Sequence, residues 1–191
     1  VLYGDYDVDG VTSITLLYSI LRAFGLEART FLPTRLEEGY GLSVKGIENS
    51  FEDDPPDLLI AADCGTNSRD EARLLREMGI DLIILDHHEP SPEGVADCAA
   101  LVNPKLGEHF HYLCTAGVVF KIMHALLKTR PLKDFDLKIY LDIVALGTIA
   151  DIVPLEGENR LFARRGLAQL DRTIHPGLVA LKSVAGVTSP M

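Results

Sequence analysis

Asp5-Tyr6-Asp7-Val8-Asp9-Gly10 is the stretch on which the interpretation of this chain depends. It follows an apolar run at residues 1–4, which predicts the end of a β-strand. It precedes residues 11–24, whose apolar side chains recur at helical spacing. Alternate residues of an extended chain point to the same side, so three carboxylates converge there and repel one another unless a cation lies among them. An acidic loop with its charges in water is the alternative.

Apolar runs alternate with helical patterns beyond this stretch. The predicted strands are residues 28–32, 58–62, 80–85 and 99–102, and the predicted helices between them are residues 44–51 and 69–78. Strands that are apolar along their whole length are buried on both faces, which is typical of parallel sheets. We therefore predict an α/β fold, with a doubly wound, mainly parallel sheet and helices on both faces.

The second half of the chain is mainly helical. Helical patterns cover residues 115–127, 137–149, 161–170 and 178–184. No flexible linker separates these helices from the strands. We expect one domain over residues 1–191, with a sheet part at about residues 1–104 and a helical C-terminal extension at about residues 112–191.

Composition limits the possible classes of protein. The chain has 191 residues with a net charge of −10, so bulk electrostatics disfavour nucleic-acid binding unless bound metal reverses the local field. No apolar stretch predicts a membrane span, and no signal peptide is visible. Three cysteines without CxxC spacing indicate a reducing compartment, and we expect a cytoplasmic protein. Because the chain begins with Val1 inside a predicted strand, we expect it to be a fragment.

Charged side chains follow two further predicted strands. Asp63 follows residues 58–62, and Asp86-His87-His88 follows residues 80–85. The carboxyl ends of parallel strands form the ligand-binding edge of an open α/β sheet. Asp151 is the one acid in an apolar stretch at a predicted helix end. We expect these groups to meet in one site.

Acids with one or two histidines suit Mn²⁺ or Mg²⁺. A buried acid costs several kcal/mol unless it is paired or metal-bound, and few Lys or Arg residues lie nearby in sequence. Such a cluster can hold two ions about 3.5–4 Å apart, which activate water and stabilise a phosphoryl oxygen. Other roles remain open: Asp63 could cap a helix, His87-His88 could be a capping or core pair, and Asp151 could cap a helix or pair with Arg160.

Four motifs resemble those of the DHH phosphoesterase superfamily. They are GDYDVDG (4–10), AADCGTNS (61–68), LDHHEP (85–90) and GTIADIVPL (147–155). With RLEEGYGLS (35–43), VNPK (102–105) and ENR (158–160), the chain is most similar to the single-strand-specific 5′→3′ DNA exonucleases of that superfamily. The resemblance covers residue 2 to about residue 172.

The resemblance implies roles for individual residues. The implied metal ligands are Asp7, Asp9, Asp63, His87 and Asp151, with Asp63 bridging two ions. Several members have a histidine where this chain has Tyr3, so Asp5 is a further candidate ligand or a contact behind the ligands. His88 is expected to face the substrate phosphate, with Asp86 orienting a neighbouring histidine. Arg160 and Arg35 are expected to hold phosphate oxygens.

The resemblance also implies a reaction, in which a metal-activated water attacks a phosphodiester. The expected substrate is the 5′ end of single-stranded DNA in recombination or repair, with single-strand-binding protein and a helicase as possible partners. Members of this kind have a second, substrate-binding domain, whose signature this chain lacks. The alternatives are a DHH phosphoesterase acting on short oligonucleotides, cyclic dinucleotides, phosphoadenosine phosphate or pyrophosphate, and a non-catalytic replication or repair scaffold.

Overall fold

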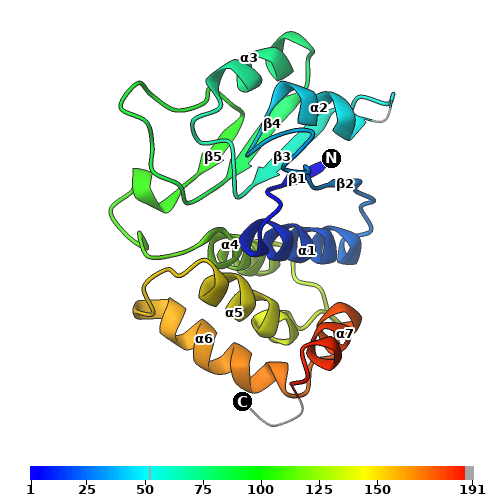
Figure 1. Cartoon of the computed structure of the whole chain (residues 1–191), viewed down its shortest axis with the longest axis vertical. Helices are drawn as coiled ribbons and strands as arrows, with labels where there is room; N and C mark the ends of the chain where they lie inside the picture. Colours follow the sequence, from blue (N-terminus) through cyan, green and yellow to red (C-terminus); the bar gives the residue numbers. More distant parts are fainter. Residues whose placement is uncertain (52, 188–191) are drawn as a thin grey trace.

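Five parallel strands form the centre of the fold in the computed structural model, which describes residues 1–51 and 53–187 (Figure 1). Their order in the sheet is β2-β1-β3-β4-β5, and every neighbouring pair is parallel. The strands are β1 (Leu2–Gly4), β2 (Thr30–Phe31), β3 (Leu58–Ala62), β4 (Asp81–Leu85) and β5 (Ala100–Val102). The predicted parallel α/β sheet is confirmed.

Helices cover both faces of this sheet. The helices α1 (Val8–Ala23) and α4 (Thr115–Thr129) lie on one face, and α2 (Val44–Phe51) and α3 (Arg69–Glu77) lie on the other (Figure 1). Successive strand residues point to opposite faces, and both sets are apolar. In β3, Leu59 and Ala61 join the core beneath α2 and α3, whereas Ala62 joins the core beneath α1 and α4. Burial on both faces explains why the strands read as unbroken apolar runs.

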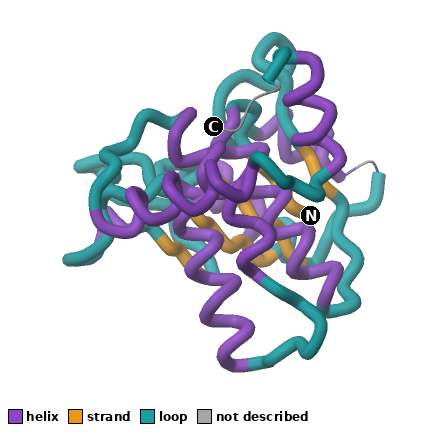
Figure 2. Tube along the Cα trace, turned by 90° about the horizontal axis from the view of Figure 1, so that it is seen from below, coloured by secondary structure: helices purple, strands orange, loops and turns teal. Residues whose placement is uncertain are grey.

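The helical extension adds further layers beneath α1 and α4. After α4 it comprises the short 3₁₀ turn η2 (Leu137–Tyr140) and the helices α5 (Leu141–Ala150), α6 (Gly157–Leu170) and α7 (Pro176–Val184), whereas a second 3₁₀ turn, η1 (Pro104–Leu106), lies between β5 and α4. Helix α5 packs against α1 and α4, and α6 packs against α5. Seen from below, these helices lie across the strands (Figure 2). The predicted extension to residue 191 ends outside the described residues, which stop at residue 187.

Several sequence-based boundaries were wrong, among them the start of α6, at Gly157 rather than residue 161, and the start of β2, at Thr30 rather than residue 28. Helix α1 begins at Val8 rather than residue 11, because Asp7 caps it and accepts a hydrogen bond from the Gly10 N–H at 2.9 Å. The argument from alternating side chains assumed that the whole acidic stretch is extended. This is wrong for Val8, Asp9 and Gly10, which belong to α1. The predicted helix 137–149 is divided into two elements, because the 3₁₀ turn η2 ends at Tyr140 and the α-helix α5 begins at Leu141.

Membrane-spanning length is not reached in the part of the chain that the structure describes. No helix there is both long enough and apolar enough to cross a bilayer. The prediction that the chain carries no such helix agrees with this finding for the described residues.

Candidate metal centre

The strand order brings the acidic segments together. Strands β1 and β3 are neighbours, and the chain leaves β1 towards β2 on one side but leaves β3 towards β4 on the other, so these two connections run in opposite directions along the sheet. Ligands of open α/β sheets bind at such a switch point, outside the carboxyl ends of the strands. Asp5 directly follows β1, Asp63 directly follows β3, and Asp86 directly follows β4.

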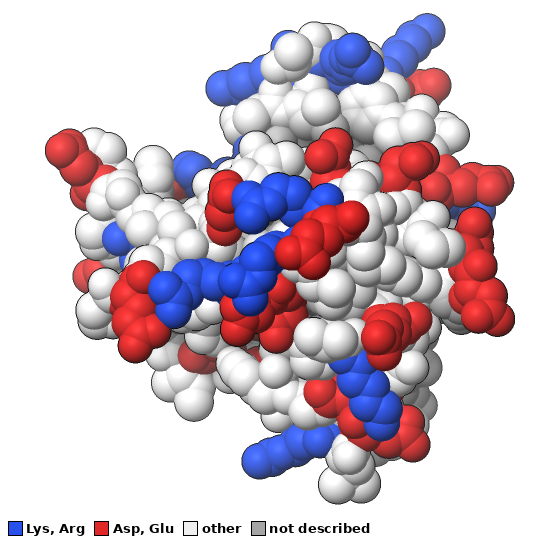
Figure 3. Space-filling model, turned by 90° about the horizontal axis from the view of Figure 1, so that it is seen from above, with Lys and Arg blue, Asp and Glu red and all other residues white. Residues whose placement is uncertain are grey.

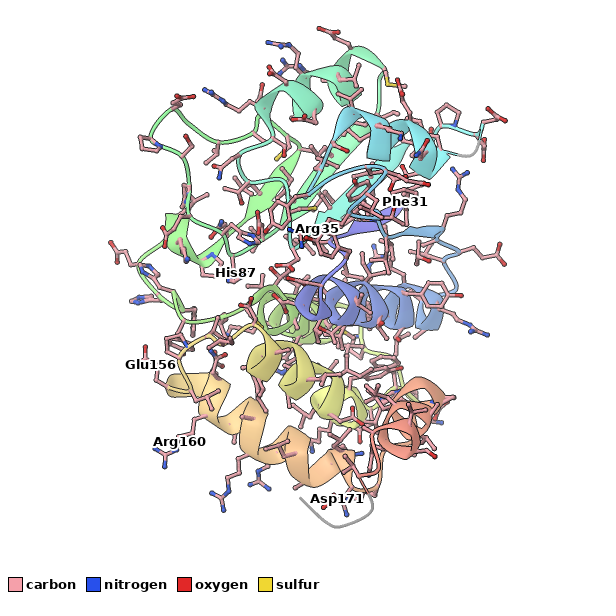
Figure 4. The ribbon with its side chains drawn as sticks, in the orientation of Figure 1. Phe31, Arg35, His87, Glu156, Arg160 and Asp171 are labelled. Carbon is pink, nitrogen blue, oxygen red and sulfur yellow. The ribbon has the colours of Figure 1, made fainter. Side chains whose placement is uncertain are left out.

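Three carboxylates converge on one histidine nitrogen. The Nε2 atom of His87 lies 3.4 Å from Asp151 Oδ2, 3.6 Å from Asp63 Oδ1 and 3.9 Å from Asp9 Oδ2. Neither His87 Nε2 nor Asp151 Oδ2 makes a hydrogen bond of normal geometry within the described residues, although both atoms are buried. Figure 4 shows His87 at the gap between the sheet and the helical layer.

A second group adjoins the first. One oxygen each from Asp5, Asp7 and Asp63 can be chosen so that all three lie within 4.8 Å of one another. Asp5 is fully buried, and both of its carboxylate oxygens lack a hydrogen bond of normal geometry to any described residue. Asp63 belongs to this group and also lies beside His87 in the first one, so its expected role as a bridge between two ions stays a prediction. Tyr3 instead buries its ring in the core and donates to the Gly41 carbonyl at 3.0 Å.

The pKa values report uncompensated negative charge. Burial, together with the charges of Asp9 and Asp7, raises the pKa of Asp63 far above its usual range. The same causes raise the pKa of Asp151 to about 6. Burial also raises the pKa of Asp5, although the nearby backbone N–H groups of Tyr6 and Gly41 offset part of that rise. A divalent cation would stabilise all of these carboxylates in the ionised form.

His87 is suited to bind that cation. Burial lowers the pKa of His87, although the charge of Asp9 opposes this. The ring is therefore neutral near pH 7 and offers a nitrogen lone pair, the form in which histidine binds metals. Neutral imidazole with several carboxylates suits Mn²⁺ and Mg²⁺, so the unpartnered buried atoms and the donor set both fit the expected ions.

The N-terminus of α4 holds two of the acids. Asp9 accepts hydrogen bonds from the backbone N–H groups of Thr115 at 2.7 Å and Ala116 at 2.9 Å. The Thr115 hydroxyl donates to Asp63 Oδ1 at 2.9 Å. Sequence analysis missed Thr115, although a threonine at the start of a predicted helix signals free N–H groups that attract carboxylates.

Asp86 lies behind the cluster and orients His88. Its Oδ1 accepts from His88 Nδ1 at 2.8 Å, and its Oδ2 accepts from the Thr66 N–H at 3.0 Å. Burial alone would raise the pKa of Asp86, but these hydrogen bonds outweigh it and hold that pKa below its usual range. The hydrogen bond to Asp86 raises the pKa of His88. On the other side of the ring, the hydroxyl of Tyr40, also missed from sequence, lies 3.1 Å from His88 Nε2.

The two predicted phosphate-binding arginines lie in different places. Figure 4 shows Arg160 on the outer side of α6, pointing away from His87, so the structure does not bring it into the cluster. Arg35 is exposed in the loop between β2 and α2, above the gap beside His87 (Figure 4). Its role as a phosphate contact stays a prediction.

The remaining alternatives for the acids do not fit the geometry. Ser68, not Asp63, occupies the N-cap position of α3. Asp63 instead adopts the left-handed backbone conformation with φ of 67°, which aspartate tolerates better than most residues. Asp151 lies at the C-cap of α5, and no ion pair joins it to Arg160 in the described part of the chain.

A doubly wound sheet with a carboxylate and histidine cluster at its switch point defines an α/β protein with a candidate divalent-metal site. The chain belongs to the DHH family, whose N-terminal domain model matches residues 1–148. The motifs that suggested this family therefore identified it correctly.

Two of the proteins to which the chain is similar are exonucleases with the name RecJ. The chain is 41% identical to the single-stranded-DNA-specific exonuclease RecJ of Bacillus subtilis and 37% identical to that of Thermus thermophilus, over 97% and 98% of its own residues. It spans only 23% and 27% of the lengths of these relatives. A crystal structure of an exonuclease RecJ bound to manganese matches 98% of the chain and 47% of its own, with a TM-score of 0.86 and 36% identity.

Proposed function

We propose that this chain is the catalytic part of a metal-dependent phosphoesterase that digests single-stranded DNA from its 5′ end. The convergence of Asp9, Asp63 and Asp151 on the Nε2 atom of His87 carries the proposal. Buried acids in such a cluster are stabilised by divalent cations. The similarity to RecJ exonucleases supports the choice of substrate.

The ligands that we propose for two Mn²⁺ or Mg²⁺ ions follow from the two groups in the cluster. They are Asp5, Asp7, Asp9, Asp63, His87 and Asp151. Bound there, the ions would supply Lewis acidity and lower the pKa of a water molecule. The protein's own part is to fix the geometry: the α4 N-terminus holds Asp9, and Thr115 holds Asp63.

His88 and Asp86 form the proposed catalytic pair. His88 is half-buried at the edge of the cluster, and Asp86 fixes its ring through Nδ1. Its Nε2 atom lies 3.1 Å from the Tyr40 hydroxyl, and we propose that a substrate phosphate oxygen replaces this hydroxyl and accepts a hydrogen bond from Nε2. Arg35 is the better placed of the two arginines to contact that phosphate.

Binding of a long strand needs more than this chain supplies. The net charge is −10, and on the face seen in Figure 3 several of the basic side chains lie beside acidic ones. Arg69–Glu93 and Arg76–Asp97 are ion pairs of this kind. We propose that a second, substrate-binding domain outside residues 1–191 supplies the basic surface. Single-strand-binding protein, a helicase and a cytoplasmic location belong to the same proposal.

An exonuclease assay with Mn²⁺ on 5′-labelled and 3′-labelled single strands tests the function, using a protein that extends past residue 191 to include the proposed second domain. We expect mononucleotides to be released from the 5′ end, and Asp63→Ala to abolish both this release and the calorimetric signal of Mn²⁺ binding. Asp70→Ala is the matched control, because Asp70 is an exposed acid on α3 that pairs only with its neighbour Arg73 in the described structure. Digestion from the 3′ end, or cleavage of dinucleotides alone, would contradict the exonuclease assignment.

A further inference from the structure

Ile152 has an unusual backbone conformation beside the metal centre. It directly follows the candidate ligand Asp151, and its φ of 58° lies in the left-handed region. That region is unfavourable for a β-branched side chain, and helices commonly place glycine at this position after their last turn. Among the described residues, Ile152 is the only β-branched one with a positive φ.

The residues on either side explain how the strained conformation is maintained. The Asp151 N–H donates to the Gly147 carbonyl at 3.0 Å, which ends α5 with the carboxylate facing His87. Val153 packs against the core, and the Pro154 carbonyl accepts a hydrogen bond from the buried Asn159 at 3.0 Å. Strained conformations persist where the surrounding structure fixes them in this way.

The strained conformation of Ile152 does not pack its side chain against other described residues. Ile152 is 89% exposed, so its side chain covers almost no other residue. A single exposed isoleucine is ordinary, but a strained and exposed isoleucine next to a candidate metal ligand is not. Its conformation directs an apolar side chain outward at the edge of a site that is otherwise acidic.

From this arrangement we infer that Ile152 contacts the base of the nucleotide whose phosphate lies at the metal centre. This inference rests on the function proposed above. The base is the large apolar surface of a nucleotide. Consecutive Cα atoms are only about 3.8 Å apart, so the Cα atom of Ile152 lies close enough to that of Asp151 for one nucleotide to contact both residues. Figure 4 shows Glu156, at the far end of the same loop, on the side of the molecule where His87 lies.

The sheet part offers an exposed aromatic ring beside His88. Tyr40 is 64% exposed while its hydroxyl lies 3.1 Å from His88 Nε2, and its ring contacts that of Tyr6 edge-on at 6.2 Å between centroids. Tyr40 comes from the sheet part, whereas Ile152 comes from the helical part. The helical part thus presents an exposed apolar side chain next to Asp151, and the sheet part presents an exposed aromatic ring beside His88.

The test compares two single strands, one with a normal 5′-terminal thymidine and one with an abasic 5′-terminal deoxyribose. We expect wild-type protein with Mn²⁺ to show a kcat/KM about 10-fold lower on the abasic strand, since burying one aliphatic side chain has an effect of this order. Ile152→Gly should lose about 10-fold on the normal strand and no longer distinguish the two strands. Its affinity for Mn²⁺ should be unchanged.

Three further variants test whether the discrimination depends on the apolar side chain of Ile152 or on the conformation of the loop. Ile152→Val keeps an apolar β-branched side chain and should keep the discrimination. Leu155→Ala removes another exposed side chain from the same loop, and should also keep it. Ile152→Asn should raise Tm by about 2–4 °C, because asparagine tolerates the left-handed region, and should lose the discrimination.

The outcomes distinguish this inference from the proposed function. If wild-type protein cleaves both strands and Ile152→Gly still distinguishes them, the base contact is wrong while the exonuclease stands. An equal loss on both strands in Ile152→Gly, with the discrimination intact, would point to a contact with another part of the protein and would also overturn the inference. If wild-type protein neither binds Mn²⁺ nor cleaves either strand, the proposed function fails and this inference fails with it.

Discussion

The partners of each aspartate decide what it contributes to the site. Asp9 and Asp86 accept hydrogen bonds from backbone N–H groups, which stabilise a carboxylate without any cation. Both oxygens of Asp5 and the Oδ2 atom of Asp151 are buried without a hydrogen bond of normal geometry to a described residue, and burial is the main cause that raises the pKa of each acid. Asp63 accepts one hydrogen bond from the Thr115 hydroxyl, and burial still raises its pKa far above the usual range. These three acids are therefore the ones whose ionised form depends most on bound metal.

Thr115 is the residue through which the α4 N-terminus controls the bridging acid. Replacing it by valine removes the hydroxyl that donates to Asp63 Oδ1 but keeps the N–H that donates to Asp9. Because outer contacts of this kind orient metal ligands, we expect Thr115→Val to weaken Mn²⁺ binding about 10-fold and to lower the exonuclease rate similarly. Isothermal calorimetry and the exonuclease assay measure these two effects.

Serine at the same position is the control for this prediction. Thr115→Ser keeps a hydroxyl and should retain wild-type Mn²⁺ affinity. Equal affinities of wild-type protein and Thr115→Val would mean that Asp63 is positioned by its own backbone conformation, without help from α4.

At the scale of elements, the site depends on a close approach of α5 to α1 and α4. Gly147 lies in α5 where a Cβ atom would be 2.5 Å from Thr12 Oγ1 and 2.9 Å from Asp9 Oδ1. Gly147→Ala should therefore push α5 outward and move Asp151 away from His87. We expect a loss of about 1–3 kcal/mol in the free energy of unfolding, measured by denaturant titration, together with weaker Mn²⁺ binding.

A glycine-to-alanine substitution at an uncrowded position is the control, because it changes helix propensity without crowding. A Cβ atom at Gly177, near the start of α7, meets no described atom within 4 Å. Gly177→Ala should therefore keep or slightly raise stability, because alanine is the better helix former. If Gly147→Ala is as stable and binds Mn²⁺ as well as Gly177→Ala, the helices tolerate more separation than the packing implies.

The elements themselves were predictable where burial dominates. The strands 58–62 and 99–102 were predicted to within one residue, because parallel strands buried on both faces form unbroken apolar runs. The first turn of α1 was missed because Val8 and Asp9 carry no helical apolar pattern, and the start depends on the Asp7 cap. The division of residues 137–149 was missed because a 3₁₀ turn and an α-helix have similar periodicities.

At the scale of the whole molecule, the site lies where the sheet part meets the helical part. Sequence predicted the residues that carry charge, since strand ends and motifs mark them. It did not predict their partners: Thr115 lies 106 residues from Asp9, and their contact exists only because α4 packs against the sheet. The strained Ile152 was also invisible, because a left-handed conformation at a non-glycine residue has no sequence signature.

The raised pKa values of the cluster couple its charge to the stability of the fold. Below about pH 4, Asp151 is protonated in both the folded and the unfolded chain. As pH rises, the unfolded chain loses this proton first, while the folded chain keeps it until about pH 6. The folded state then binds more protons, so the free energy of unfolding contributed by Asp151 falls across this interval. Asp63 and Asp5 act in the same direction.

Bound metal should reverse this loss, so the Mn²⁺-induced rise in Tm should increase from pH 5 to pH 7. The reason is linkage: Mn²⁺ binds the ionised carboxylates of the folded state, and fewer protons must be displaced as pH rises. Differential scanning fluorimetry with and without saturating Mn²⁺ measures the effect and cancels the contributions of groups outside the site. Asp63→Asn should raise Tm in the absence of metal at pH 7 and flatten the dependence on Mn²⁺. A Mn²⁺-induced rise in Tm that is independent of pH would show that the cluster is already ionised without metal, contrary to the electrostatics of three acids around one histidine.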